Sequence, residues 1–186
     1  MIVFSKTPYR ISLIGGGTDT NRWFDNHNGF TFSFTIDKHC YISVRNLSNF
    51  FDHKYRLVYS KIEQVDKIAQ IKHPSIREVL KFTKNKTGLE IHHDGDLPAR
   101  SGIGSSSAFT VGMLNAMNVF NEKNLNKNTL AKNAIYIEQK MIKENVGCQD
   151  QLACSLGGIN FIEYRKGNKF KINEIKLNKE NLNLIE

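Results

Sequence analysis

The sequence predicts an α+β fold, in which strands come first, helices follow and strands return at the end. Three observations support this prediction. Apolar and polar residues alternate in several segments of residues 2–97, apolar residues recur at helical spacing between about 105 and 141, and alternation returns after residue 158. The chain lacks the regular succession of strand, helix and strand that is typical of a doubly wound parallel sheet.

The first strands are expected on either side of a glycine-rich turn. Residues 2–14 alternate enough to predict a strand pair, bent or bulged at Pro8, that stops at the triple glycine Gly15–Gly17. The clearest strand pattern covers residues 30–46, where three phenylalanines alternate with threonine and serine. We expect two strands in this segment, joined by a short turn near Asp37–Lys38.

The middle of the chain combines strands with a first helix. The pattern predicts a strand over residues 55–60, a helix over 74–83 and a strand over 88–97. A longer helix is expected from about Ser105, since four apolar residues then recur at steps of four, three and four: Phe109, Met113, Ala116 and Phe120.

The last third continues with helices and ends in a hairpin. A second long helix is indicated by the same spacing of Leu130, Ala134, Ile137 and Met141. Asn128 is its expected N-cap and Gly147 its expected stop. We expect a short helix over residues 149–156 and a hairpin over 158–177.

The composition is that of a globular protein. The 186 residues are 40% hydrophobic and 24% charged, and no run of about 18 apolar residues predicts a membrane-spanning helix. The N-terminus lacks the pattern of a secretory signal. The three cysteines, Cys40, Cys148 and Cys154, form no CxxC pair and are expected to be reduced thiols. We therefore expect a cytoplasmic protein without a membrane partner.

The formal net charge of +8 allows three explanations. Its lysines are scattered through a chain that is rich in asparagine, isoleucine and lysine, which favours a compositional bias. Attraction of a phosphorylated small molecule ranks second. Nucleic-acid binding ranks third, because no module of basic and aromatic residues stands out, and we expect no nucleic-acid partner.

The segment Ser101–Ser107 combines two glycines with four serines directly before the long helix. The N-terminus of a helix presents unpaired N–H groups and a positive dipole end. Gly102 and Gly104 remove side chains that would block a close approach, while the serines supply hydroxyls. These features favour a phosphate site over a merely well-capped helix. The segment is neither a Walker A loop, which needs lysine where Ser105 stands, nor a dinucleotide fingerprint, which needs glycine at Ser107.

The residues Pro98–Ala108 resemble the phosphate-binding motif of the GHMP kinases, Pro-x-x-x-Gly-Leu-Gly-Ser-Ser-Ala. Five residues match, with Ile103 in place of leucine and Ser107 as an extra serine: Pro98, Gly102, Gly104, Ser105 and Ser106. Residues 6–19 are similar to the family's N-terminal motif, and residues 145–161 to its aspartate-bearing segment. Together the motifs are most similar to those of heptose 7-phosphate kinases and fucokinase-like sugar kinases.

The resemblance implies two domains, an N-terminal one similar to domain 2 of ribosomal protein S5 and a C-terminal ferredoxin-like one. The family's third glycine-rich motif, which lies in the second domain, has no counterpart here. We therefore expect residues 1–186 to be the N-terminal ATP-binding domain of a longer kinase, with the C-terminal domain largely absent.

The resemblance also assigns the cofactors, ATP and Mg²⁺. The loop would hold the ATP phosphates, and its expected ligands are Pro98, Arg100, Ser101, Gly102, Ile103, Gly104, Ser105, Ser106 and Ser107. Ser105 and Glu138 would bind Mg²⁺, which prefers hard oxygen ligands. The alternative for Glu138 is an ordinary surface ion pair.

The remaining assignments concern the acceptor of the phosphoryl group. Asp150 would take the proton of the acceptor hydroxyl or orient it, and the alternative is a helix cap. Arg10 would lie near the transferred phosphoryl group, and the alternative is a surface arginine. Gly17, Thr18 and Asp19 would bind sugar hydroxyls, and the alternative is a plain glycine-rich turn.

The expected activity is ATP-dependent, Mg²⁺-dependent phosphorylation of a hydroxyl on a small sugar or sugar phosphate. Two alternatives stay open. One is a kinase of the same fold that acts on mevalonate or homoserine. The other is a non-catalytic module that binds a nucleotide or RNA, for which a steep salt dependence would be the mark.

Overall fold

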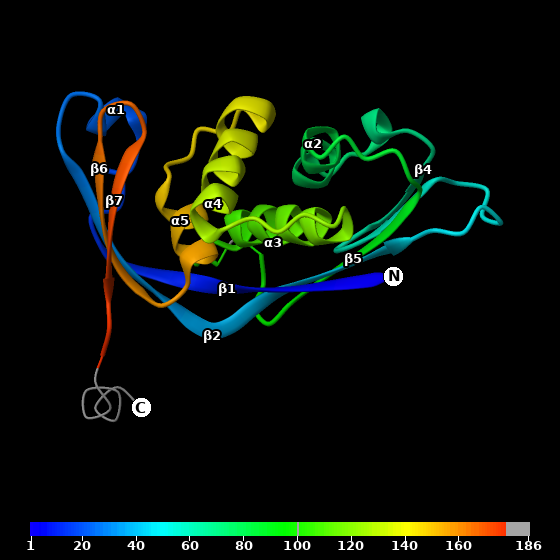
Figure 1. Cartoon of the computed structure of the whole chain (residues 1–186), viewed down its shortest axis with the longest axis horizontal. Coiled ribbons are helices and arrows are strands. Elements are labelled where there is room, and N and C mark those ends of the chain that lie inside the picture. The colour runs from blue at the N-terminus through cyan, green and yellow to red at the C-terminus, as the bar shows by residue number, and fades with distance from the viewer. Residues whose placement is uncertain (100, 178–186) are drawn as a thin grey trace.

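A computed structural model describes residues 1–99 and 101–177 as a bent, mostly antiparallel sheet with helices on one face (Figure 1). Its strands are β1 (Ile2–Ile14), β2 (Gly29–Asn46), β3 (Tyr55–Val58), β4 (Ile62–Val65), β5 (Leu89–Gly95), β6 (Ile159–Arg165) and β7 (Lys169–Ile175). Its helices are α1 (Asn21–Phe24), the 3₁₀-helix η1 (Ile68–Gln70), α2 (Pro74–Phe82), α3 (Ser105–Phe120), α4 (Lys127–Tyr136), the π-helix η2 (Ile137–Ile142) and α5 (Gln149–Leu156). The predicted α+β class is confirmed.

The sheet is organised around β2, the longest strand. The strand order is β4-β3-β5-β2-β6-β7, with β1 alongside β2. The first part of β2 pairs with β6 and its second part with β5, while β1 pairs antiparallel with both parts. β3 and β5 form the parallel pair of the described sheet. β2 therefore connects the two halves of the molecule.

The expected turn at Asp37–Lys38 is wrong, because β2 continues through these residues. Opposite Asp37, the register of β1 shifts, from Pro8 paired with His39 to Arg10 paired with Thr35. Such a β-bulge places extra residues on one strand and bends it without ending the pairing. The irregularity predicted at Pro8 is confirmed. Residues 2–14, however, form the single strand β1 and not the predicted strand pair.

The alternating phenylalanines of β2 face away from the helices. Thr31 is fully buried, and its hydroxyl lies 2.6 Å from the hydroxyl of Tyr164, whereas Phe30 is 41% exposed. Phe30 stacks on Phe161 on the outer face of the sheet. The period-2 pattern identified a strand but not which of its faces lies inside.

α3 is the central helix and lies across the sheet beneath α2 and α4 (Figure 1). It begins at Ser105, as predicted, and most of its side chains are buried. Gly112 allows the close approach to β1, since a β-carbon there would lie 2.7 Å from the hydroxyl oxygen of Thr7.

The second long helix differs from its prediction at both ends. The N-cap of α4 is Asn126, not Asn128, and its side chain accepts a hydrogen bond from the N–H of Thr129 at 2.8 Å. The helix does not run on to Gly147. It widens into the π-helix η2, which is followed by Lys143 in a left-handed conformation with φ 66°. π-Helical segments within helices are rare and often occur at functional sites.

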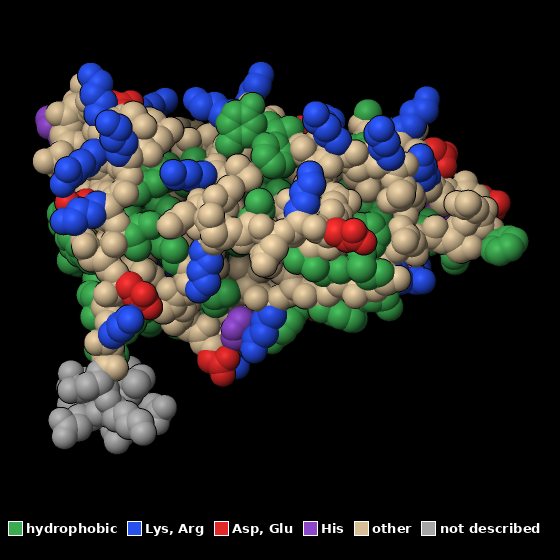
Figure 2. All heavy atoms as spheres, viewed as in Figure 1, with side chains coloured by type: hydrophobic (Ala, Val, Ile, Leu, Met, Phe, Trp, Pro, Cys, Tyr) green, Lys and Arg blue, Asp and Glu red, His purple; other side chains and the backbone are tan. Residues whose placement is uncertain are grey.

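The surface and the cysteines agree with the expectations from composition. Figure 2 shows lysine and arginine side chains scattered over the visible face and not gathered into one stripe. The three cysteines are buried and unpaired. Within residues 1–99 and 101–177, no helix combines the length and apolarity that crossing a membrane requires.

We predict that Gly112→Ala destabilises the chain, although alanine favours a helix by roughly 1 kcal/mol. The added methyl group would overlap Thr7, and overpacking of this kind costs about 1–3 kcal/mol. Thermal unfolding measures the effect. The double variant Thr7→Ala/Gly112→Ala should recover most of the loss, and equal losses in both would contradict the packing explanation.

Candidate functional site

The glycine-serine loop adopts a conformation that glycine makes possible. Gly102 and Gly104 have φ values of 73° and 74°, in the left-handed region. Gly104 is the N-cap of α3, and its carbonyl accepts the N–H of Ala108 at 2.8 Å. The loop therefore ends at the N-terminus of a 16-residue helix, as an anion site requires. Arg100, which was assigned to this loop, lies outside the described residues.

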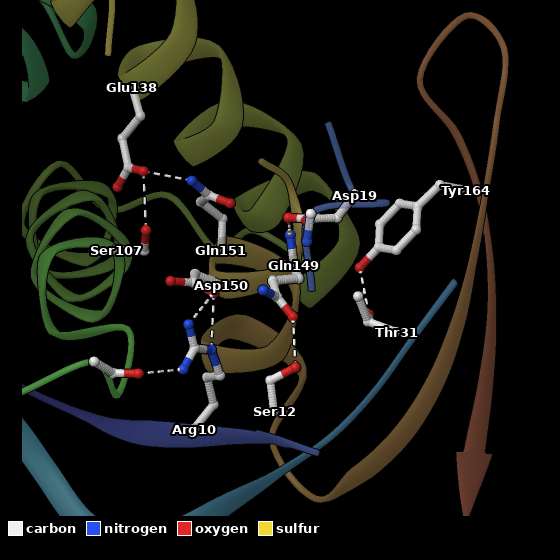
Figure 3. Close-up of polar contacts among 12 residues, drawn as sticks. Arg10, Ser12, Asp19, Thr31, Ser107, Glu138, Gln149, Asp150, Gln151 and Tyr164 are labelled. Carbon is white, nitrogen blue, oxygen red and sulfur yellow. Dashed lines mark hydrogen bonds and ion pairs between the residues drawn. The ribbon is translucent and has the colours of Figure 1, made fainter. Parts of the chain in front are cut away.

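Arg10 connects the loop with Asp150 (Figure 3). Its Nε and Nη2 lie 2.8 and 2.6 Å from Oδ1 of Asp150, and its Nη1 donates to the carbonyl of Gly102 at 2.8 Å. Its backbone N–H donates to the carbonyl of Ile103 at 3.1 Å. Because Arg10 is only 8% exposed, the alternative of a surface arginine is wrong.

Asp150 lies in the first turn of α5, but it is not the helix cap. The N-cap is Cys148, and the carboxylate of Asp150 is directed at Arg10. Burial raises the pKa of the Asp150 carboxyl, although the Arg10 guanidinium acts in the opposite direction. A carboxylate with a raised pKa beside a helix N-terminus is suited to proton transfer.

Glu138 points into the protein from the first turn of η2 and is 1% exposed, so the surface ion pair is excluded. Its Oε2 accepts hydrogen bonds from the hydroxyl of Ser107 at 2.9 Å and from the side-chain amide of Gln151. Burial raises the pKa of this carboxyl. Ser107, which the sequence assigned only to the phosphate loop, thus contacts Glu138, and the assignment of Ser105 to Mg²⁺ stays a prediction.

The surroundings of Glu138 fit a magnesium ion. Its Oε1 is buried and has no hydrogen-bond partner among the described residues, and the same holds for Oε1 of Gln151. No group of three or more His, Cys, Asp or Glu gathers in residues 1–99 and 101–177. Mg²⁺ needs no such group, because it uses one or two carboxylates together with substrate phosphates.

The glycine-rich turn before α1 is fixed by close backbone contacts. A β-carbon on Gly15 would lie 2.0 Å from the carbonyl oxygen of Phe30. The hydroxyl of Thr18 lies 2.8 and 2.7 Å from the carbonyls of Gly15 and Phe30. Asp19 is buried, and its carboxylate accepts backbone N–H groups. The role of Gly17, Thr18 and Asp19 in binding sugar stays a prediction.

The structure adds polar residues that the sequence did not single out. Ser12 donates to Oε1 of Gln149 at 2.9 Å, and Gln151 donates to Glu138. Gln149 lines a pocket of about 400 Å³ between β1, the glycine turn and the phosphate loop. The two glutamines flank Asp150 in the sequence, and this was the signal that could have identified them.

A larger pocket of about 550 Å³ lies beside Ser105 and Ser106. Its aromatic wall was not predicted and consists of Tyr9, Tyr59, His73, His93 and Phe109. The ring of His73 stacks on Phe109 with centroids 4.5 Å apart, and the edge of Tyr59 meets His73 at 4.9 Å. Burial lowers the pKa of His73 to about 4 and also lowers that of His93, so both rings are neutral at pH 7.

The buried His73 predicts a loss of stability in acid. Because its pKa is lower in the folded chain than the ordinary 6.5, the unfolded chain binds more protons between pH 6.5 and about 4. The free energy of unfolding should therefore fall as the pH falls through this window, by up to roughly 3 kcal/mol from this residue. His73→Asn keeps a good N-cap for α2 and should flatten the slope in chemical denaturation measured across this range. The exposed His27→Asn is the control, and equal slopes for both variants would contradict the prediction.

Several known proteins are similar to this chain in sequence. Residues 71–158 match the family model described as GHMP kinases N terminal domain. The D-glycero-alpha-D-manno-heptose 7-phosphate kinase of Campylobacter jejuni is 31% identical over 182 residues, which cover 93% of this chain and 54% of that protein. A galactokinase of Chloroflexus aurantiacus is 26% identical over 164 residues, 82% of this chain and 40% of the relative. The chain thus spans about half the length of the curated relatives it matches.

Solved structures agree on the fold. A D-glycero-D-manno-heptose 1-phosphate kinase from Bacteroides thetaiotaomicron superposes with a TM-score of 0.86 at 24% identity, covering 97% of this chain and 61% of that one. A putative sugar kinase from Campylobacter jejuni superposes with a TM-score of 0.74 at 26% identity, covering 96% and 57%. Residues 71–158, which include the glycine-serine loop, Glu138 and Asp150, thus match the N-terminal domain of the GHMP kinases.

Proposed function

We propose that this chain is the ATP-binding part of a kinase that phosphorylates a hydroxyl of a sugar or sugar phosphate, with a heptose phosphate as the preferred acceptor class. The main support is Arg10, which is hydrogen-bonded both to Asp150 and to the phosphate loop at Gly102. A phosphoryl donor on the loop would thus lie next to the carboxylate that serves the acceptor. The similarity to the heptose 7-phosphate kinase of Campylobacter jejuni favours the heptose acceptor.

The nucleotide would extend from the loop into the aromatic pocket. The N-terminus of α3 attracts the phosphates through its N–H groups and its dipole. Ser105 and Ser106 lie at the border between loop and pocket. The flat faces of His73 and Phe109 suit a nucleobase, because planar rings stack favourably.

The acceptor would occupy the pocket between β1 and the glycine turn, whose volume of about 400 Å³ suits a sugar. Asp150 would take the proton from the hydroxyl as the phosphoryl group moves. Arg10 would stabilise the negative charge that spreads over the transferred group. Gly15 and Gly16 line this pocket, while Gly17 lines a neighbouring pocket together with Asp19 and Asp150. A sugar that reached from one pocket to the other would meet Gly17, Thr18 and Asp150.

Magnesium would be held by Glu138 and a serine of the loop, Ser107 or Ser105. When bound, Mg²⁺ neutralises charge on the ATP phosphates. The role of this chain is to present the carboxylate without a competing ion pair, since the partners of Glu138 are the neutral groups of Ser107 and Gln151.

A second acceptor class, galactose, has support from the 26% identity to the galactokinase of Chloroflexus aurantiacus. Two mevalonate kinases among the similar structures share 20% and 22% identity and support the fold alone. An RNA-binding role has weaker support, because the basic side chains on the face shown in Figure 2 are scattered and not gathered into one stripe.

We predict that Gly104→Ala weakens ATP binding by about tenfold or more, a change of roughly 1.4 kcal/mol, measured by calorimetry. Alanine is strained at φ 74°, and its methyl group would lie 3.3 Å from Cγ of Arg10 and 3.4 Å from Oδ2 of Asp150. Gly167→Ala is the matched control, since Gly167 has φ 76° and open space around it in the turn between β6 and β7. Unchanged affinity in a folded Gly104 variant would refute the role of the loop.

We also predict that Asp150→Asn lowers turnover by about 100- to 10,000-fold while the affinity for ATP stays the same. Asparagine keeps the size of the side chain and removes its basicity. Transfer from labelled ATP to D-glycero-D-manno-heptose 7-phosphate and to galactose measures turnover and separates the two acceptor classes. The control is Asp37→Asn, whose carboxyl is 99% exposed. Turnover within a fewfold of the unmodified protein would remove Asp150 from the mechanism.

A further inference from the structure

Asp19 supplies the helix cap that α5 lacks in its own sequence. Cys148, the N-cap residue, makes no side-chain capping bond. Its N–H donates instead to the backbone carbonyl of Asp19 at 3.1 Å, and the N–H of Gln149 donates to Oδ2 of Asp19 at 3.1 Å. Asp19 comes from the glycine turn, 130 residues earlier in the sequence. A carboxylate at this end of a helix is also favoured by the helix dipole.

The carboxylate of Asp19 is held from its other side as well. Its Oδ1 accepts the N–H of Gly17 at 3.0 Å, and the residue is 4% exposed. Both carboxylate oxygens thus already accept backbone N–H groups (Figure 3). This arrangement is typical of a structural carboxylate, and it contrasts with the open position that a sugar ligand needs.

Gly147 leaves the space that this arrangement requires. A β-carbon there would lie 1.8 Å from Oδ2 and 2.4 Å from Cγ of Asp19. Gly147 is not among the glycines with positive φ, so its backbone would accept any residue. Contact with Asp19 is therefore the reason for glycine at this position.

We propose that Asp19 is a positioning residue that acts through α5, holding the helix start so that Asp150, the residue after Gln149, meets Arg10. The proposal rests on the proposed function in one respect, namely the role given there to Asp150. Gly147 is needed for the same arrangement, because its lack of a side chain leaves room for the carboxylate of Asp19 against the backbone just before the helix.

The first test is a double-mutant cycle on the stability of the chain. Gly147→Ala should lower the melting temperature by roughly 3–10 °C, because the methyl group and the carboxylate cannot share the space. In the Asp19→Ala background the same substitution should cost much less, since the obstacle is gone. Losses that add independently would overturn the proposal. If Asp19→Ala does not fold, Asp19→Ser removes the carboxylate oxygen nearest to position 147 and should give partial coupling.

The second test reports on the position of Asp150. The Nε–H of Arg10 is buried and donates to Asp150 at 2.8 Å, so its NMR signal should exchange slowly with water. In Asp19→Ala or Asp19→Asn this exchange should become about tenfold faster, because local opening of the pair becomes easier. Asp37→Ala removes the same charge from an exposed site and should leave the exchange rate unchanged.

The two readouts separate this proposal from the proposed function. Neither needs ATP turnover, so a chain without kinase activity would still show the coupling and the change at Arg10. If Asp19 acted only as a sugar ligand, the exchange of Arg10 would not respond to its substitution. An unchanged exchange rate in the folded Asp19 variants therefore overturns the positioning role.

Discussion

The arrangement of the site depends on the hydrogen bonds of one side chain, Arg10. Its guanidinium bonds to Asp150 and to the carbonyl of Gly102, while its backbone N–H bonds to Ile103. β1, α5 and the phosphate loop thus meet at a single residue. Breaking a buried ion pair leaves an uncompensated charge, which is costly. The three segments are therefore held in one mutual arrangement, although they are far apart in the sequence.

The long pairing of β1 with β2 places Arg10 where these segments meet. The bulge between Pro8 and Arg10 changes the register by two residues of β2 without ending the pairing. The first part of β2 can then pair with β6 and the second with β5. α3 crosses the bend on the inner face, so its N-terminus lies near Arg10 while its C-terminus lies over the other half of the sheet (Figure 1).

Two buried carboxylates, Asp19 and Glu138, and the half-buried Asp150 belong to this part of the molecule, and each one has its own hydrogen-bond donors. Asp150 has Arg10, Asp19 has the N–H groups of Gly17 and Gln149, and Glu138 has neutral groups. Burial raises the pKa of Asp150 and of Glu138, because desolvation disfavours their charged forms. The charge of Asp19 also raises the pKa of Asp150. The site thus combines one arginine and a helix N-terminus with carboxylates that differ in their surroundings.

The sequence by itself determined the fold class, most of the elements and the position of the glycine-serine loop before α3, because periodicity and glycine placement are local properties of the chain. α3 and α5 begin at the expected residues, whereas helical spacing left the inward and surface positions of Glu138 open, and its burial was decided by the fold. Only the tertiary structure decided which face of β2 is buried, that Ser107 meets Glu138, and that Asp19 caps α5. These outcomes depend on contacts between segments about 30 to 130 residues apart, and no local pattern encodes which partner satisfies a buried polar group.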